Sequence, residues 1–192
     1  PTNEMNRTEA VFSDLAKVDA RTIRYSLVSR EFDESARTFT APQTIVASGR
    51  IGASVLFPRV TPDGRYVIIT LASFGVFPIW HRESELAIVD LRTKSLRVAS
   101  ELNSDEAESY HTISSNGRWL VFSSRRKDGT YTRPYFAHFD PATAHFTKPF
   151  VLPVRDPAEH DRRFLSYNIP EFAKGPIRYS RSELRRVPDA GK

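Results

Sequence analysis

The chain has 192 residues and a net charge of +5, and hydrophobic residues make up 40% of it and aromatic residues 11%. This apolar content suffices for a packed core and excludes an intrinsically disordered chain. The absence of cysteine excludes disulfides, thiolate metal sites and a cysteine nucleophile. No apolar run reaches the roughly 18 residues of a membrane helix, so we expect no membrane span.

The basic charge is concentrated in an arginine-rich C-terminal segment and in the cluster 125–127. A nucleic-acid surface would combine basic residues with exposed aromatic side chains on one platform. Most aromatic residues here fall at strand positions that we expect to be buried. We therefore predict a solvated basic surface and no nucleic-acid partner.

The first predicted elements lie before residue 50. Residues 6–17 carry apolar side chains at helical spacing after Thr8, which predicts either a short helix capped by Thr8 or an irregular loop. Residues 23–47 predict two strands joined by a polar turn. Their end, FTAPQTIV from Phe39, parallels FTKPFVLP from Phe146.

The next feature is a segment that occurs twice, TPDGRYVIIT at 61–70 and SSNGRWLVFS at 114–123. A polar turn ending in Gly-Arg, followed at once by aromatic and β-branched residues, is typical of a tight turn that leads into a buried strand. The two turn glycines stand 53 positions apart, and repeats of this period suggest propeller blades.

The repeat extends on both sides of the turn. An aromatic residue, Phe57 or Tyr110, precedes each turn by six positions, which predicts an incoming strand. Each copy continues with a strand that ends on aspartate, ELAIVD or PYFAHFD, and then with a polar turn and a fourth strand. Four short strands joined by hairpin turns form one propeller blade.

The last recognisable element, SYNIPEF at 166–172, parallels SYHTISS at 109–115 and predicts the first strand of a further blade. We therefore predict an all-β fold of four-stranded antiparallel propeller blades, in an incomplete ring of about two full and two partial blades. All of these blades belong to one propeller domain fragment. Its first unit, 1–53, is a partial blade that has a third and a fourth strand after an N-terminal loop or short helix. Full blades follow at 54–104 and 105–155, then the start of another blade at 156–181 and a tail at 182–192.

A closed propeller has about 4 to 8 blades, more than this chain provides. Terminal repeats with open faces need capping or a partner. We therefore expect either a portion of a longer protein or self-association through open blade edges.

The turn residues have a structural interpretation. Asp-Gly and Asn-Gly supply the positive backbone dihedral angles that a tight hairpin requires, so we predict structural roles for Asp63, Gly64, Asn116 and Gly117. The aromatic residues that follow, Tyr66 and Trp119, are expected to be buried between blades, with stacking on a sugar as the alternative.

Candidate ligand-binding residues lie near the expected channel. Ser109, Tyr110 and His111 belong to a first strand, which borders the channel of a propeller. Guanidinium groups suit carboxylates, which adds three arginines. The predicted ligand-binding set is Tyr110, His111, Arg125, Arg126 and Arg133.

The remaining histidines and carboxylates do not predict a metal site or a catalytic site. His81, His111 and His138 lack the spacing of a zinc site, so we predict no metal. Carboxylates at Glu83, Glu85 and Asp90 fit strand and turn positions better than the acid and base of a glycosidase. No catalytic residue and no cofactor are predicted.

The turns 61–66 and 114–119, with the strand end Phe122–Arg126, resemble the WD-like β-propeller repeats of bacterial TolB-type proteins. The first copy departs from that pattern, because Leu71–Pro78 lacks the basic pair found at Arg125 and Arg126. The resemblance implies a noncatalytic binding scaffold of the bacterial cell envelope, periplasmic or exported, that engages a protein, peptide or glycan partner. The alternative is a propeller-fold polysaccharide lyase or glycoside hydrolase.

Overall fold

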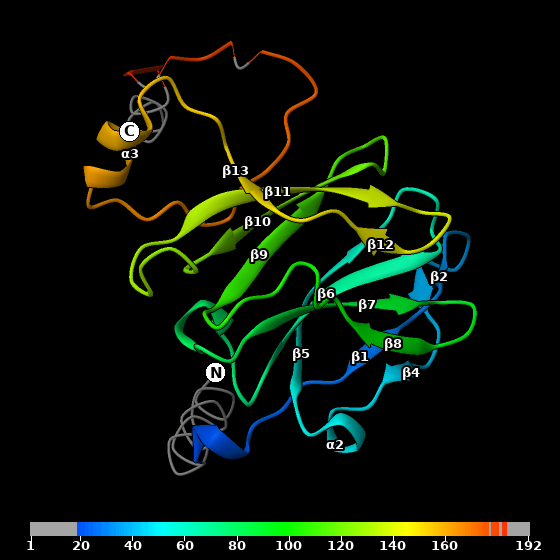
Figure 1. Ribbon diagram of the computed structural model, residues 1–192. Helices are drawn as coiled ribbons and strands as arrows, with labels where there is room; N and C mark the ends of the chain where they lie inside the picture. The colour runs from blue at the N-terminus through cyan, green and yellow to red at the C-terminus, as the bar shows by residue number, and fades with distance from the viewer. Residues whose placement is uncertain (1–18, 177, 181, 184–192) are drawn as a thin grey trace, which may run out of the picture.

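The computed structural model describes residues 19–176, 178–180 and 182–183, and its regular structure is almost entirely antiparallel β-sheet (Figure 1). The short helix or irregular loop expected at 6–17 and most of the expected tail lie outside these residues. No helix in the described part of the chain is long and apolar enough to cross a membrane. The helical segments are short: η1 (Ala20–Thr22), α2 (Ser48–Ile51), η2 (Pro78–Trp80) and α3 (Pro157–Arg162).

The first complete blade is a four-stranded sheet in which each strand pairs with the next along the chain. Its innermost strand β5 follows α2, and its outermost strand β8 ends at residue 98. The strands are β5 (Ser54–Val60), β6 (Tyr66–Ala72), β7 (Glu85–Asp90) and β8 (Ser95–Val98).

The second complete blade repeats this order, except that its fourth strand is divided into two pieces that both pair with β11. The break falls at Lys148 and Pro149, where proline has no N–H to donate to the neighbouring strand. The strands are β9 (Glu108–Ile113), β10 (Trp119–Ser124), β11 (Arg133–Asp140), β12 (His145–Phe146) and β13 (Phe150–Val151).

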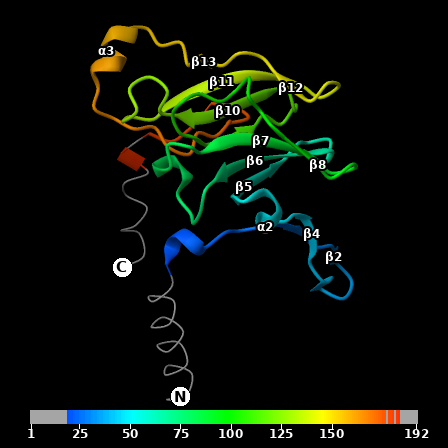
Figure 2. The same ribbon diagram turned by 60° about the horizontal axis from the view of Figure 1, so that its bottom comes forward.

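The N-terminal strands form a hairpin that is interrupted on both arms. The inner part pairs β1 (Leu27–Ser29) with β4 (Gln43–Val46), and the outer part pairs β2 (Phe32–Asp33) with β3 (Thr38–Phe39). Figure 2 shows this hairpin, the first blade and the second blade as successive layers. The prediction of an all-β fold of propeller blades is confirmed.

Apolar side chains fill both interfaces around the first blade. On one face, Ile68 and Leu86 pack against Leu120 and Phe122 of the second blade, in a cluster that also holds Tyr66 and Phe139. On the other face, a second cluster joins the first blade to β1 and β4. Because burial of one such side chain contributes about 1.5–3 kcal/mol, these two layers are the main source of stability.

The repeated glycine turns have the same geometry in both blades. Thr61 and Ser114 each donate a side-chain hydrogen bond to the turn residue, at 2.5 Å to Asp63 and at 2.7 Å to Asn116. The same Asp63 and Asn116 oxygens accept the backbone N–H two residues on, each at 3.0 Å. Both turn glycines are left-handed, with φ of 70° and 67°.

A second repeated turn occurs three times, joining β2 to β3, β7 to β8 and β11 to β12. An aspartate opens each copy, and its carboxylate accepts two backbone N–H groups at Asp33 and Asp90, and one backbone N–H and the Thr143 hydroxyl at Asp140. The residue four positions on has a positive φ in every copy. The pairs are Asp33 with Arg37, Asp90 with Lys94, and Asp140 with Ala144. The N-terminal hairpin therefore carries the same turn that joins the last two strands of both complete blades.

Two expectations are wrong in detail. Tyr66 is 3% exposed between the blades, whereas its counterpart Trp119 is 39% exposed, because no blade in the described part of the chain packs over that face of β10. The segment Ser166–Phe172 forms no strand. It lies across β10 and β11 instead, where the Ser123 hydroxyl donates to the carbonyl of Tyr167 and Phe136 contacts Phe172.

The left-handed turn can be tested with two alanine variants. An added Cβ would meet open space at both Gly64 and Gly49, but only Gly64 has a positive φ. We expect Gly64→Ala to lower the free energy of unfolding by about 1–2 kcal/mol. Gly49→Ala should leave it unchanged or raise it slightly. Chemical denaturation measures both, and equal effects would contradict the turn's role.

Candidate functional site

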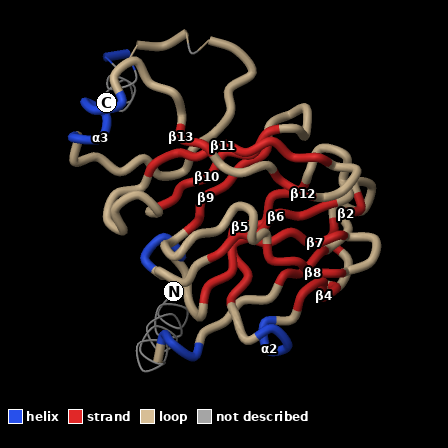
Figure 3. The backbone as a smooth tube through the Cα atoms, in the orientation of Figure 1, coloured by secondary structure: helices blue, strands red, loops and turns tan. Residues whose placement is uncertain are grey.

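Loops of both blades meet at one end of the sheets, beside the start of β9 and the end of β10 (Figure 3). We call this end the loop face. It is formed by the β6–β7 connection (73–84), the β8–β9 connection (99–107) and the β10–β11 connection (125–132). Most of the predicted ligand-binding residues lie here or on the adjacent strand β9.

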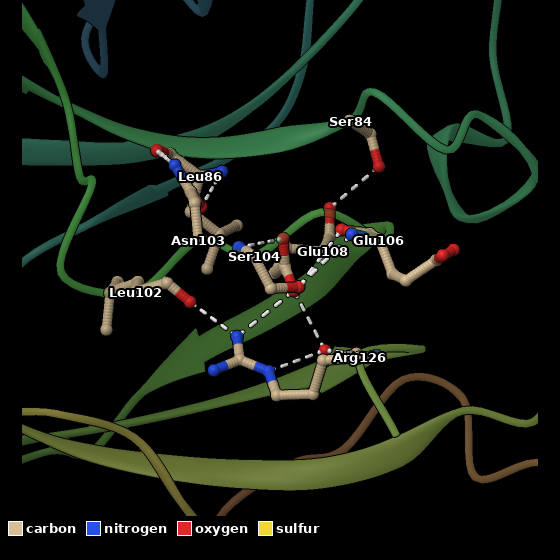
Figure 4. A network of polar contacts seen from close by, with 9 residues as sticks. Ser84, Leu86, Leu102, Asn103, Ser104, Glu106, Glu108 and Arg126 are labelled. Carbon is tan, nitrogen blue, oxygen red and sulfur yellow. Dashed lines mark hydrogen bonds and ion pairs between the residues drawn. The ribbon is translucent and has the colours of Figure 1, made fainter. Parts of the chain in front are cut away.

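A buried carboxylate organises the loop face. Glu108 is fully buried at the start of β9, and Figure 4 shows its side chain among donors from two connections. Ser104 donates to it through its hydroxyl at 2.7 Å, Ser124 through its hydroxyl at 2.8 Å and Arg126 through Nη2 at 3.0 Å. Burial raises the pKa of the Glu108 carboxyl, although these donors act in the opposite direction.

Arg126 contacts several other groups of the chain besides Glu108. Its guanidinium also donates to the Leu102 carbonyl and to the Ser124 hydroxyl. It lies 4.6 Å from the Tyr135 ring centre. Arg126 lies in the β10–β11 connection and joins it to Glu108 at the start of β9 and to Leu102 in the β8–β9 connection, so it fixes the shape of the loop face.

Arg133 is also internal, with 1% of its surface exposed. Its Nη1 donates to the carbonyls of Thr132 and Leu165, and its Nη2 donates to the carbonyl of Arg163. These bonds attach the segment around residue 165 to the start of β11. The role of the Arg133 side chain is therefore structural.

His111 links the two blades below the loop face. Its Nε2 lies 2.9 Å from the Ile68 carbonyl, and its Nδ1 lies 3.3 Å from the Thr70 hydroxyl. Nε2 must donate to the carbonyl, and in the neutral ring Nδ1 then accepts from the Thr70 hydroxyl. Burial lowers the pKa of His111 from 6.5 to about 4.

Tyr110 lies at a bulge in the innermost strand. Both Tyr110 and its counterpart Phe57 have positive φ, 43° and 50°, where the β9–β10 and β5–β6 registers shift. Their rings are 5.1 Å apart, so neighbouring innermost strands meet through an aromatic pair. Ser109, next to Tyr110, has a buried hydroxyl with no hydrogen-bond partner among the described residues.

Arg125 differs from Arg126 and Arg133 because its guanidinium forms no hydrogen bond or ion pair with the described residues. Its guanidinium carbon lies 4.4 Å from the ring centre of Trp80, whose side chain is 74% exposed at the end of η2. The described residues offer this guanidinium no ion-pair or hydrogen-bond partner, and its Nε is buried. The stack holds at the loop face a cationic group whose charge no described residue neutralises.

Trp80 and Arg125 line a pocket of about 370 Å³ together with residues from the second blade and the C-terminal segment. This pocket, called the Trp80 pocket below, lies in the size range of small-molecule sites. Its other lining residues are Ile79, Gly129, Thr130, Tyr131, Thr132, Ser166 and Asn168.

The polar side of the Trp80 pocket is preorganised. The buried Thr132 donates its hydroxyl to Asn168 Oδ1 at 2.8 Å, which leaves the Asn168 amide nitrogen available as a donor. Asp128 accepts the backbone N–H groups of Thr130 and Tyr131, at 2.8 and 2.7 Å. These bonds fix the β10–β11 connection before any ligand enters.

The structure thus separates the predicted ligand-binding residues. Arg125 lines the pocket and Tyr110 lies on the innermost strand. His111 and Arg126 are hydrogen-bonded within the fold, and Arg133 is bonded there through Nη1 and Nη2. A ligand role for the set stays a prediction. Sequence reasoning missed Trp80 and Asn168, although a tryptophan three residues after a phenylalanine in a proline-containing connection was a visible signal.

Comparisons with known proteins give no sequence-level relative: no protein family and no curated protein matches the chain. Among solved structures, the chain is similar to a luciferin-regenerating enzyme, with 13% identity and a TM-score of 0.46 over 67% of this chain and 40% of that one. It is also similar to the β-propeller domain of the Trilobed protease from Pyrococcus furiosus, with 16% identity and a TM-score of 0.40 over 71% of this chain and 45% of that one. The chain spans less than half the length of both.

The neutral His111 predicts a pH-dependent stability. Its pKa is about 4 in the folded chain against 6.5 for an unperturbed histidine, so the unfolded state binds more protons between these pH values. The free energy of unfolding should therefore fall as pH falls from 6.5 to 4, by roughly 3 kcal/mol from this group. Denaturation of the parent chain and of His111→Gln across this range isolates the effect, and parallel profiles would contradict it.

The buried pair of Glu108 and Arg126 predicts non-additive variants. Glu108→Gln leaves the guanidinium without its counter-charge, so we expect a loss of about 3–5 kcal/mol in unfolding free energy. Glu108→Gln combined with Arg126→Met removes both charges and should lose less than Glu108→Gln alone. Calorimetry or chemical denaturation of the full cycle measures the coupling, and additive losses would show that the pair is not coupled.

Proposed function

We propose that this chain is a noncatalytic β-propeller binding scaffold that acts in the bacterial cell envelope, in the periplasm or exported from the cell. In this proposal it is TolB-like and engages a protein, peptide or glycan partner through the loop face. The resemblance of the turns at 61–66 and 114–119 to TolB-type repeats supports the envelope assignment.

The observation that carries the binding role is the contrast between neighbouring polar groups. Glu108, His111 and Arg133 are buried, Arg126 is partly buried, and all four are hydrogen-bonded within the fold, which they stabilise. Arg125 is stacked on an exposed tryptophan beside a pocket with preset polar groups. Exposed tryptophan, tyrosine and arginine are the residue types that dominate binding energy at protein surfaces.

Immobilised bacterial envelope glycans and synthetic peptides, probed with the labelled chain, test the proposal. We expect at least one probe to bind and Trp80→Ala to remove about 2 kcal/mol of its binding free energy, as expected of a hot-spot residue. Trp119→Ala is the matched control, because Trp119 lies outside the Trp80 pocket.

Two results would contradict the proposal. If no probe is retained, the loop face is not a binding surface for these classes. If mass spectrometry finds that a glycan probe is cleaved by the chain, the polysaccharide lyase or hydrolase alternative replaces the scaffold.

A further inference from the structure

We propose that the Trp80 pocket binds an acidic peptide segment of a protein partner. One carboxylate side chain of this segment pairs with Arg125, and an adjacent apolar side chain packs on Trp80. This inference rests on the proposed scaffold function and names its partner class.

The case for a carboxylate begins with the guanidinium of Arg125. The partly buried Arg126 and the buried Arg133 use their terminal guanidinium nitrogens within the fold, Arg126 for Glu108 and Arg133 for three carbonyls, although Arg133 Nε has no partner among the described residues. Arg125 has a buried Nε and no partner among the described residues, yet its position is fixed by the Trp80 ring. A planar donor held in place suits the two oxygens of a carboxylate.

The neighbouring polar groups agree with an anionic ligand. Because Asn168 Oδ1 accepts the Thr132 hydroxyl, the exposed end of the amide is its donor. The lining residues of the pocket include no aspartate or glutamate. The carboxylate of Glu106 comes near the backbone of Gly129, but it is paired with Arg82 at 3.1 Å.

The surroundings favour a peptide over a single sugar. Tyr131, which lines the pocket, has its ring 5.9 Å from the ring of Phe164, and Phe164 is 82% exposed. Leu165 beside it and Phe77 in the Trp80 connection are exposed as well. Exposed apolar side chains next to the segments that line the pocket are typical of a protein-binding patch, because an extended segment covers more of them than one sugar ring does.

The test uses a capped pentapeptide with glutamate at its centre between phenylalanine and leucine, and two matched peptides with glutamine or lysine at that centre. The chain has two tryptophans, so Trp119→Phe leaves Trp80 as the single fluorescent indole. We expect the glutamate peptide to change Trp80 emission saturably. The glutamine peptide should bind about tenfold more weakly, because a charge-assisted bond is lost, and the lysine peptide more weakly still.

Variants at Arg125 test whether this residue causes the preference for a negatively charged central side chain in the peptide. In Arg125→Gln the preference for glutamate over glutamine should disappear, while Arg125→Lys keeps a charge and should retain part of it. Arg92→Gln is the matched control, since it makes the same charge change at an exposed position in the β7–β8 turn and should leave the preference intact. Circular dichroism of each variant checks folding.

The outcomes separate this inference from the scaffold proposal. Equal affinity for the three peptides, or an Arg125→Gln variant that keeps the glutamate preference, would overturn the acidic-peptide assignment. An acidic disaccharide that binds in a Trp80-dependent manner where the peptides do not would also overturn it while the scaffold stands. If neither the peptides nor the disaccharide nor the envelope probes bind, both proposals fail.

Discussion

The rest of the structure depends on the apolar layer between the two complete blades. Ile68 and Leu86 from one sheet and Leu120 and Phe122 from the next are almost fully removed from water there. These faces of the two sheets are apolar and cover each other, so each would be exposed to water if the other blade were removed. The layer also sets the spacing of the connections at the loop face, and with it the distance between Trp80 on one blade and Arg125 on the other.

Polar groups at the edge of this layer divide into two kinds. His111 crosses from the second blade to the backbone of β6, and Glu108 joins two connections through Arg126 and two serines. Both are buried, and burial is affordable because their hydrogen-bonding atoms are paired. Arg125 is next to Arg126 but stacks on the exposed Trp80 ring instead of pairing with a buried carboxylate, so adjacent residues on one connection have different roles. A basic dipeptide in the sequence is thus one structural arginine and one available arginine.

A feature can be predicted from the sequence when the residues that cause it are close together in the chain. The turns at Gly64 and Gly117 depend on backbone angles that glycine alone adopts without strain, so the glycines in the sequence predict these turns directly. The strands between them were visible because their apolar residues form short runs that end at turn signals. For the aspartate turn at Asp33 the sequence predicts only a polar turn between two strands, although Phe32, Asp33 and Phe39 match Phe139, Asp140 and Phe146 in type and spacing.

Features that depend on distant partners were beyond sequence reasoning. His111 reads as a channel residue until Thr70 and Ile68 are placed beside it. Trp119 reads as a buried aromatic because its strand position matches that of Tyr66, but burial needs a neighbouring sheet that the strand itself does not encode. The Trp80 pocket combines three separate segments of the chain, and its existence depends on the fold of all three.

The central claim is that the shared layer makes the two blades one cooperative unit. Hydrogen exchange measured by mass spectrometry on Phe122→Ala tests it directly, since this truncation removes apolar contact worth about 3–5 kcal/mol from the second blade's side of the layer. The account predicts that amide protection falls in β6 and β7 as well as in β10 and β11. Loss of protection confined to β10 and β11, with β6 and β7 unchanged, would contradict it.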